Sequence, residues 1–120
     1  MPGFWVRLLY FSISFSPMLR WLQRRTKMQT YVILRRSGWK TGEELEAAAA
    51  VSTRIGDEEM SDQVRWIRSY VLDEEDGTVG TVCIYQAVDE DAIMEHAQRS
   101  DLPADEVILV ADTIVVRDDP

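Results

Sequence analysis

The sequence is poor in cysteine and histidine, the side chains that most often bind transition metals or serve in nucleophilic catalysis. Among its 120 residues there is one cysteine, Cys83, and one histidine, His96. A single cysteine excludes an intrachain disulfide and a Cys-x-x-Cys zinc knuckle, and it favours a reducing, cytoplasmic setting. The sequence also lacks a glycine-rich phosphate loop and a Ser-His-Asp set. These absences leave His96 as the one imidazole that a metal or a proton transfer would use.

Basic residues are scarce after the first 27 positions. Residues 1–27 carry five basic side chains and no acid, whereas residues 28–120 carry all 21 acidic side chains and eight basic ones. A domain this acidic repels phosphate backbones, so nucleic acid is not expected as a partner. It would attract cations instead, weakly across its surface or tightly at one site.

No apolar run in the N-terminal part is long enough to cross a membrane. The run over residues 8–15 is far short of the ~20 residues that a spanning helix needs. Residues 1–27 also lack the basic start and the cleavage site of a signal peptide. We expect this basic and apolar extension to be disordered or to precede a true start at Met28. The alternative is an interfacial segment that contacts an anionic membrane. The folded domain is predicted to span residues 28–118.

From Met28 onward the sequence predicts the element order β-α-β-β-α-β. Strands are expected over residues 30–36, 64–71, 78–87 and 107–116, and helices over 43–55 and 89–100. Thr41 and Glu44 have the spacing of a capping box, and Asp89 is placed to cap the second helix. Asp76-Gly77 predicts a tight hairpin. The last strand is apolar on both faces at first, as an inner strand would be.

This order is that of the ferredoxin-like α+β fold, in which two helices cover one face of a four-stranded antiparallel sheet. Alternation predicts two sets of residues that share a face: Val64, Trp66, Arg68 and Tyr70 on the second strand, and Val79, Thr81, Cys83 and Tyr85 on the third. Apolar side chains occur on both sheet faces, so the open face is expected to be covered by a second copy in a homodimer that buries sheet against sheet.

His96 falls in the apolar stripe of the second predicted helix. As a metal ligand it would need Cys83 or nearby carboxylates as partners, and nickel or zinc would prefer the imidazole and the thiolate. No ligand spacing such as His-x-x-x-His is present. The alternative is a helix histidine that packs against the sheet and bonds to a backbone carbonyl or a tyrosine.

Three short motifs occur in order on the second strand, the third strand and the second helix: Trp66-x-x-Ser69-Tyr70, Cys83-x-Tyr85, and Glu95-His96-Ala97 ahead of Pro103. Together they resemble the family of small uncharacterised ferredoxin-like bacterial proteins often labelled nickel-binding protein, over about residues 28–118. The resemblance implies a dimeric ferredoxin-like α/β barrel, no established enzyme activity, and nickel binding in some members. Arg68 stands where members of that family commonly have histidine, and a guanidinium cannot ligate a cation.

The sequence supports three functional hypotheses. In the first, the protein is a small dimeric binding protein that holds either a metal or a small ligand. Nickel or another divalent transition metal would lie at His96 and Cys83, and a small ligand would lie near Trp66, Arg68, Tyr70 and Tyr85. In the second, it is a cofactor-free monooxygenase- or isomerase-like enzyme that acts on a small anionic substrate in the cavity between sheet and helices. This requires a pocket that holds both Arg68 and His96. The third is a plain interaction module.

Overall fold

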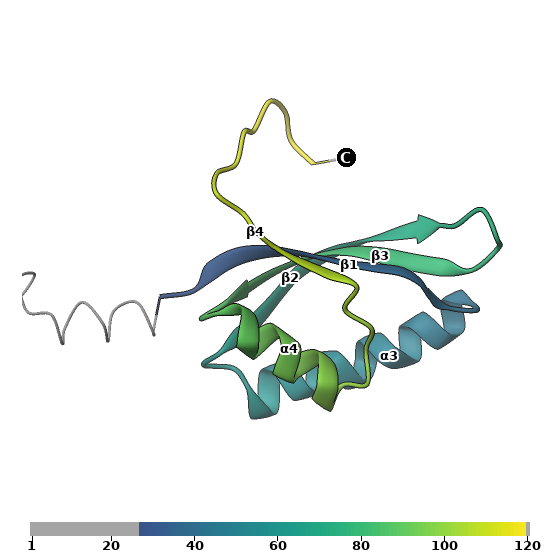
Figure 1. Cartoon of the computed structure of the whole chain (residues 1–120), viewed down its shortest axis with the longest axis horizontal. Coiled ribbons are helices and arrows are strands. Elements are labelled where there is room, and N and C mark those ends of the chain that lie inside the picture. The colour runs from purple at the N-terminus through teal and green to yellow at the C-terminus, as the bar shows by residue number, and fades with distance from the viewer. Residues whose placement is uncertain (1–26, 120) are drawn as a thin grey trace, which may run out of the picture.

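The computed structural model describes residues 27–119, which form one antiparallel sheet and two α-helices. The elements follow in this order: β1 (Gln29–Trp39), α3 (Gly42–Arg54), the π-helical turn η1 (Ile55–Glu59), β2 (Val64–Asp73), β3 (Val79–Ala87), α4 (Glu90–Arg99) and β4 (Glu106–Leu109). The strand order across the sheet is β2-β3-β1-β4. Both helices cover one face of it (Figure 1). The predicted ferredoxin-like α+β fold is confirmed, whereas the predicted extension lies, apart from Lys27, outside the described residues.

Both helices begin at the residues that the sequence predicts as caps. The Thr41 hydroxyl accepts the amide of Glu44 at 3.2 Å, and the Glu44 carboxylate accepts the amide of Lys40 at 2.8 Å. Asp89 accepts the amide of Ala92 at 2.8 Å at the start of α4. Each cap satisfies first-turn amides that have no partner inside the helix, which is typically worth ~1 kcal/mol.

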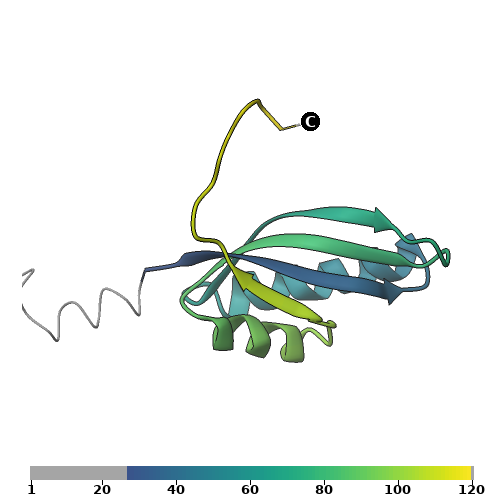
Figure 2. The same cartoon turned by 45° about the horizontal axis from the view of Figure 1, so that its top comes forward.

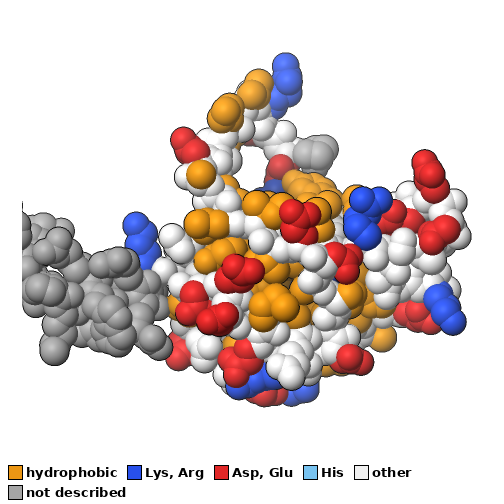
Figure 3. Space-filling model, viewed as in Figure 1, with side chains coloured by type: hydrophobic (Ala, Val, Ile, Leu, Met, Phe, Trp, Pro, Cys, Tyr) orange, Lys and Arg blue, Asp and Glu red, His pale blue; other side chains and the backbone are white. Residues whose placement is uncertain are grey.

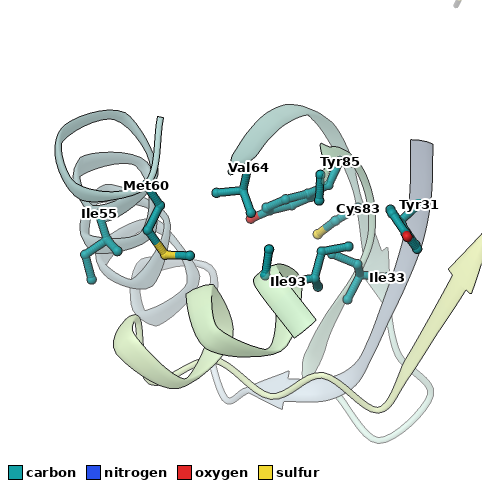
Figure 4. Packing of buried hydrophobic residues seen from close by; sticks show 10 residues of the cluster. Tyr31, Ile33, Ile55, Met60, Val64, Cys83, Tyr85 and Ile93 are labelled. Atoms are coloured by element: carbon teal, nitrogen blue, oxygen red, sulfur yellow. The ribbon is translucent and has the colours of Figure 1, made fainter. Parts of the chain in front are cut away.

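The core lies between the sheet and the helices (Figure 4). Its members come from both layers and are each 5% exposed or less: Tyr31, Ile33, Ile55, Met60, Val64, Cys83, Tyr85, Ala87, Ala92 and Ile93. Thr81, Cys83 and Tyr85 lie on one face of β3, as alternation predicts, and this face is the inward one, because all three are buried. His96 and Ala97 complete the buried stripe of α4.

A bulge at Ile67 overturns the predicted face of the second half of β2. The register pairs Trp66 with Tyr85, but it pairs Arg68 with the residue directly before Tyr85. Since residues paired across strands point to the same side, Trp66 faces the helices while Arg68 and Tyr70 face the open side. The prediction that Trp66, Arg68 and Tyr70 share a face is therefore wrong. Strict alternation does not allow for one extra residue in a strand.

The last strand is shorter than predicted and lies at the edge of the sheet. β4 pairs only with β1 in the described chain, and the amide of Val110 donates to Thr30 at 2.9 Å. Beyond this point the chain leaves the sheet on its open side (Figures 1 and 2). Ile114, Val115 and Val116 are 90, 78 and 76% exposed. Their β-branched side chains suit a strand, but pairing needs a neighbour that residues 27–119 do not supply.

The structure adds one finding on membranes. In the described part of the chain, no helix combines the length and the apolar character that a membrane-spanning helix requires.

Candidate functional site

His96 is a packed residue with one hydrogen bond. The side chain is 1% exposed, and Nε2 lies 2.9 Å from the backbone oxygen of Ser52 in α3. Because a carbonyl oxygen only accepts, Nε2 carries a proton. Nδ1 is buried and finds no hydrogen-bond partner within residues 27–119. This arrangement is the carbonyl-bonded helix histidine that the sequence offered as the alternative to a metal ligand.

The surroundings of His96 keep the imidazole neutral. Burial lowers its pKa below the usual value, the charge of Arg35 lowers it further, and the hydrogen bond to Ser52 opposes both effects. The centres of the Tyr85 and His96 rings lie 5.6 Å apart. Burial raises the pKa of Tyr85, and Arg35 only partly offsets this, so the phenol is also neutral.

His96 and Cys83 do not form a shared metal site. The Cys83 thiol is buried and donates to the Thr81 hydroxyl at 3.2 Å. The two residues border different hollows, and among the described residues no three His, Cys, Asp or Glu side chains come close enough to hold a metal ion. A nickel ion needs several donors with free lone pairs. The residues present therefore do not fit nickel at His96 and Cys83.

The four predicted ligand-binding residues separate into two pairs. Trp66 and Tyr85 stack with ring centres 5.9 Å apart on the helix side of the sheet. Arg68 and Tyr70 instead meet the C-terminal segment: Arg68 forms an ion pair with Asp119, and the Tyr70 hydroxyl lies 3.5 Å from the same carboxylate. The bulge in β2 is the reason for this separation.

A recess of about 330 Å³ borders both His96 and Arg68, as the enzyme hypothesis requires. In the structure, however, the guanidinium of Arg68 pairs with Asp119. His96 presents a ring whose protonated nitrogen already bonds to Ser52. The recess thus borders both residues, but the cation that the enzyme hypothesis needs is already paired with Asp119.

Arg35 is the polar residue of this region that sequence reasoning missed. It is 1% exposed, and its guanidinium carbon lies 5.7 Å from the centre of the Tyr85 ring. Within the described chain no carboxylate forms an ion pair with it, and its Nε and Nη2 atoms have no hydrogen-bond partner. A signal was present in the sequence, because Arg35 follows Tyr31 and Ile33 at alternate positions of β1, and this is the buried face.

Arg35 borders a cavity of about 220 Å³ between α3 and the sheet, which we call the Arg35 cavity. Much of its wall is aromatic or aliphatic, with side chains such as Trp39, Leu45, Ala49, Trp66, Cys83 and Tyr85. An apolar hollow with a few convergent polar groups is the usual form of a small-molecule site.

A larger hollow of about 1270 Å³ runs along α4 and has a different character. Its charged lining residues are all acidic: Asp62, Asp89, Asp91 and Glu95. All four are exposed, and no buried, unpaired polar group of the described chain borders this hollow. We therefore regard the smaller Arg35 cavity as the candidate site.

Comparisons with known proteins support the fold and identify a family. A family model described as nickel responsive protein SCO4226-like matches residues 31–110. Among solved structures, the crystal structure of SCO4226 from Streptomyces coelicolor A3(2) has a TM-score of 0.56 and 15% identity, covering 71% of this chain and 99% of that chain. At this identity the likeness shows the fold alone. No curated protein sequence matches the chain. The family match confirms the resemblance seen in the sequence motifs.

Proposed function

We propose that this chain, which belongs to the SCO4226-like family of nickel responsive proteins, is a binding protein for a small organic molecule. The molecule would lie in the Arg35 cavity, between α3 and the sheet. The main support for the proposal is that Arg35 is a buried cation without an acidic partner in the described chain. A buried unpaired charge costs several kcal/mol, so a ligand that pairs with Arg35 would relieve a real energetic penalty.

Nickel is not assigned to His96 in this proposal. The family description refers to a response to nickel, and such a response does not require that the protein itself hold the metal. The geometry argues for a packing role, because Nε2 of His96 is protonated toward Ser52 and the Cys83 thiol is engaged by Thr81.

We propose binding rather than catalysis. A general acid or base works best with a pKa near the working pH. Burial moves the pKa of Tyr85 upward and that of His96 downward, away from neutrality in both cases. His96 also borders the neighbouring recess rather than the Arg35 cavity.

We further propose that the protein is a homodimer in which a second copy covers the open face of the sheet. By register, four apolar residues of the central strands point to this face: Val32, Leu34, Val82 and Ile84. The exposed apolar side chains of the C-terminal segment stand clear of the body on the same side (Figure 3). Apolar surfaces of this kind usually mark contacts, and a two-fold pair would bury both of them.

Light scattering after gel filtration tests the dimer. The wild type is expected at twice the chain mass of 13.8 kDa, and Ile84→Asp is expected at the monomer mass with unchanged circular dichroism. A wild type that stays monomeric at high micromolar concentration would show that this face has another role.

A fragment screen tests ligand binding. Small neutral and charged fragments are added to the full chain, and thermal shift and tryptophan fluorescence are read, since Trp39 and Trp66 border the cavity. Ala49→Phe places a ring in the cavity, whereas Ala50→Phe changes the exposed neighbouring position. We expect fragments to stabilise the wild type and Ala50→Phe but not Ala49→Phe. If no fragment of any charge binds the wild type, the proposed function is wrong.

A further inference from the structure

We infer that the ligand of the Arg35 cavity is a small monocarboxylate with an apolar body, held by two parallel N–H groups of Arg35. This inference rests on the proposed function and adds the chemical class of the ligand. Three observations support it: two nitrogens of Arg35 lack partners in the described chain, Arg35 is the basic residue of the cavity lining, and the cavity is small.

The two nitrogens of Arg35 without partners in the described chain are Nε and Nη2. These atoms lie on the same edge of the planar guanidinium, and their N–H bonds run parallel at the spacing of the two oxygens of a carboxylate. A carboxylate therefore satisfies both donors at once. A single carbonyl oxygen does not reproduce this two-point geometry.

The neighbouring arginine shows the same pairing completed. Nε and Nη2 of Arg36 donate to the two carboxylate oxygens of Glu74, each at 2.8 Å. Arg36 is exposed to solvent, where an unpaired guanidinium would cost little. Arg35 points the other way, into the interior, and there no carboxylate of the described chain forms an ion pair with it. Buried Arg35 therefore needs an anionic partner more than exposed Arg36 does, yet only Arg36 has one in the described chain.

The charge and the size of the cavity narrow the ligand further. Arg35 is the one basic residue among the described residues that line it, so a monoanion is neutralised whereas a dianion leaves excess charge in an apolar site. A volume of about 220 Å³ corresponds to roughly seven waters at ~30 Å³ each, which suits a molecule on the order of ten non-hydrogen atoms. The stacked Trp66 and Tyr85 rings offer flat apolar surface to its body.

Glu46 is the internal competitor for Arg35. It is exposed and is the one acid among the described lining residues, and it forms no ion pair with Arg35 in the structure. If Arg35 serves a ligand, Glu46→Gln leaves the melting temperature unchanged and tightens carboxylate binding, because a repelling charge is removed. A lower melting temperature together with unchanged carboxylate affinity would assign Glu46 as the partner of Arg35 and overturn the inference.

The decisive experiment compares carboxylates with their neutral amides by calorimetric titration of the full chain. The pairs are benzoate with benzamide, phenylacetate with phenylacetamide, and hexanoate with hexanamide. We expect at least one carboxylate to bind tenfold or more tightly than its amide, as a hydrogen-bonded charge pair allows. Arg35→Met should abolish this preference. Arg35→Lys should weaken carboxylate binding about tenfold, because an ammonium lacks the parallel donors. Arg36→Met, the exposed control, should bind as the wild type does.

Each other outcome counts against a specific claim. Equal binding of acid and amide by the wild type, or a preference that survives in folded Arg35→Met, refutes the carboxylate site and leaves the proposed function standing. If Arg35→Met does not fold by circular dichroism, Arg35→Lys decides instead: a carboxylate affinity equal to that of the wild type refutes the two-point contact with Arg35. Failure of every acid and every amide, together with a failed fragment screen, refutes the proposed function itself.

Discussion

Replacing His96 separates a packing role from a functional one. The imidazole is 1% exposed and donates to the Ser52 carbonyl at 2.9 Å, so His96→Ala removes both a buried ring and a hydrogen bond between the helices. The lost bond accounts for ~1 kcal/mol and the cavity for roughly 1–3 kcal/mol more. We therefore expect a loss of about 2–4 kcal/mol in the free energy of unfolding.

Urea denaturation followed by circular dichroism measures this loss, and His96→Gln is the matched variant. A glutamine amide can place a donor near the position of Nε2, so the loss in His96→Gln should be smaller than in His96→Ala. If His96→Ala unfolds within ~0.5 kcal/mol of the wild type, the residue does not hold α4 to α3 and our reading of the site is refuted.

A comparison of the wild type with His96→Gln also tests the lowered pKa of His96. In the unfolded chain the imidazole titrates near ~6.5, while in the fold its pKa is lower, so between these values only the unfolded state takes up a proton. The stabilising contribution is fully present above pH ~6.5 and is lost as the pH falls toward the folded pKa, by at most ~1.4 kcal/mol per pH unit. The stability advantage of wild type over His96→Gln should shrink between pH 7 and 5. An advantage that grows in this range would contradict the assignment.

Three further predictions follow from single contacts. Nickel titration should give the same heats for wild type and His96→Gln, and a loss of nickel binding in the variant alone would reinstate a metal site. Gly80→Ala should cost roughly 1–3 kcal/mol in a urea melt, because the added Cβ would lie 2.7 Å from the Arg35 carbonyl oxygen; a melt like that of wild type would mean that the strand yields. Asp89→Ala should cost ~1 kcal/mol while Asp89→Asn retains most of the stability, and equal losses would point to charge rather than to capping.

Features that depend on near neighbours in the chain were predictable. Thr41 and Asp89 cap their helices because a side chain and an amide three residues apart meet in any helix that starts there. The buried stripe of α4 that contains His96 follows from helical periodicity alone. The element order, and with it the ferredoxin-like fold, also follows from such local patterns.

Features that depend on partners far away in the chain were not predictable. The bulge at Ile67 reflects how β2 fits against β3, and this one extra residue moved Arg68 and Tyr70 away from the predicted site. The C-terminal residues have the composition of a strand, yet β4 ends at Leu109 because strand pairing needs a neighbour.

Arg35 and Arg36 show which features the sequence determines and which only the tertiary structure decides. Two consecutive residues in a strand must point to opposite faces, so the sequence alone requires that one arginine face each side of the sheet. It does not say which side the helices cover. Packing of α3 and α4 against the sheet buries Arg35 and leaves Arg36 in solvent with Glu74, and this converts one of two similar residues into a candidate binding group. Burial makes the difference, because a guanidinium needs a partner only where water cannot supply one.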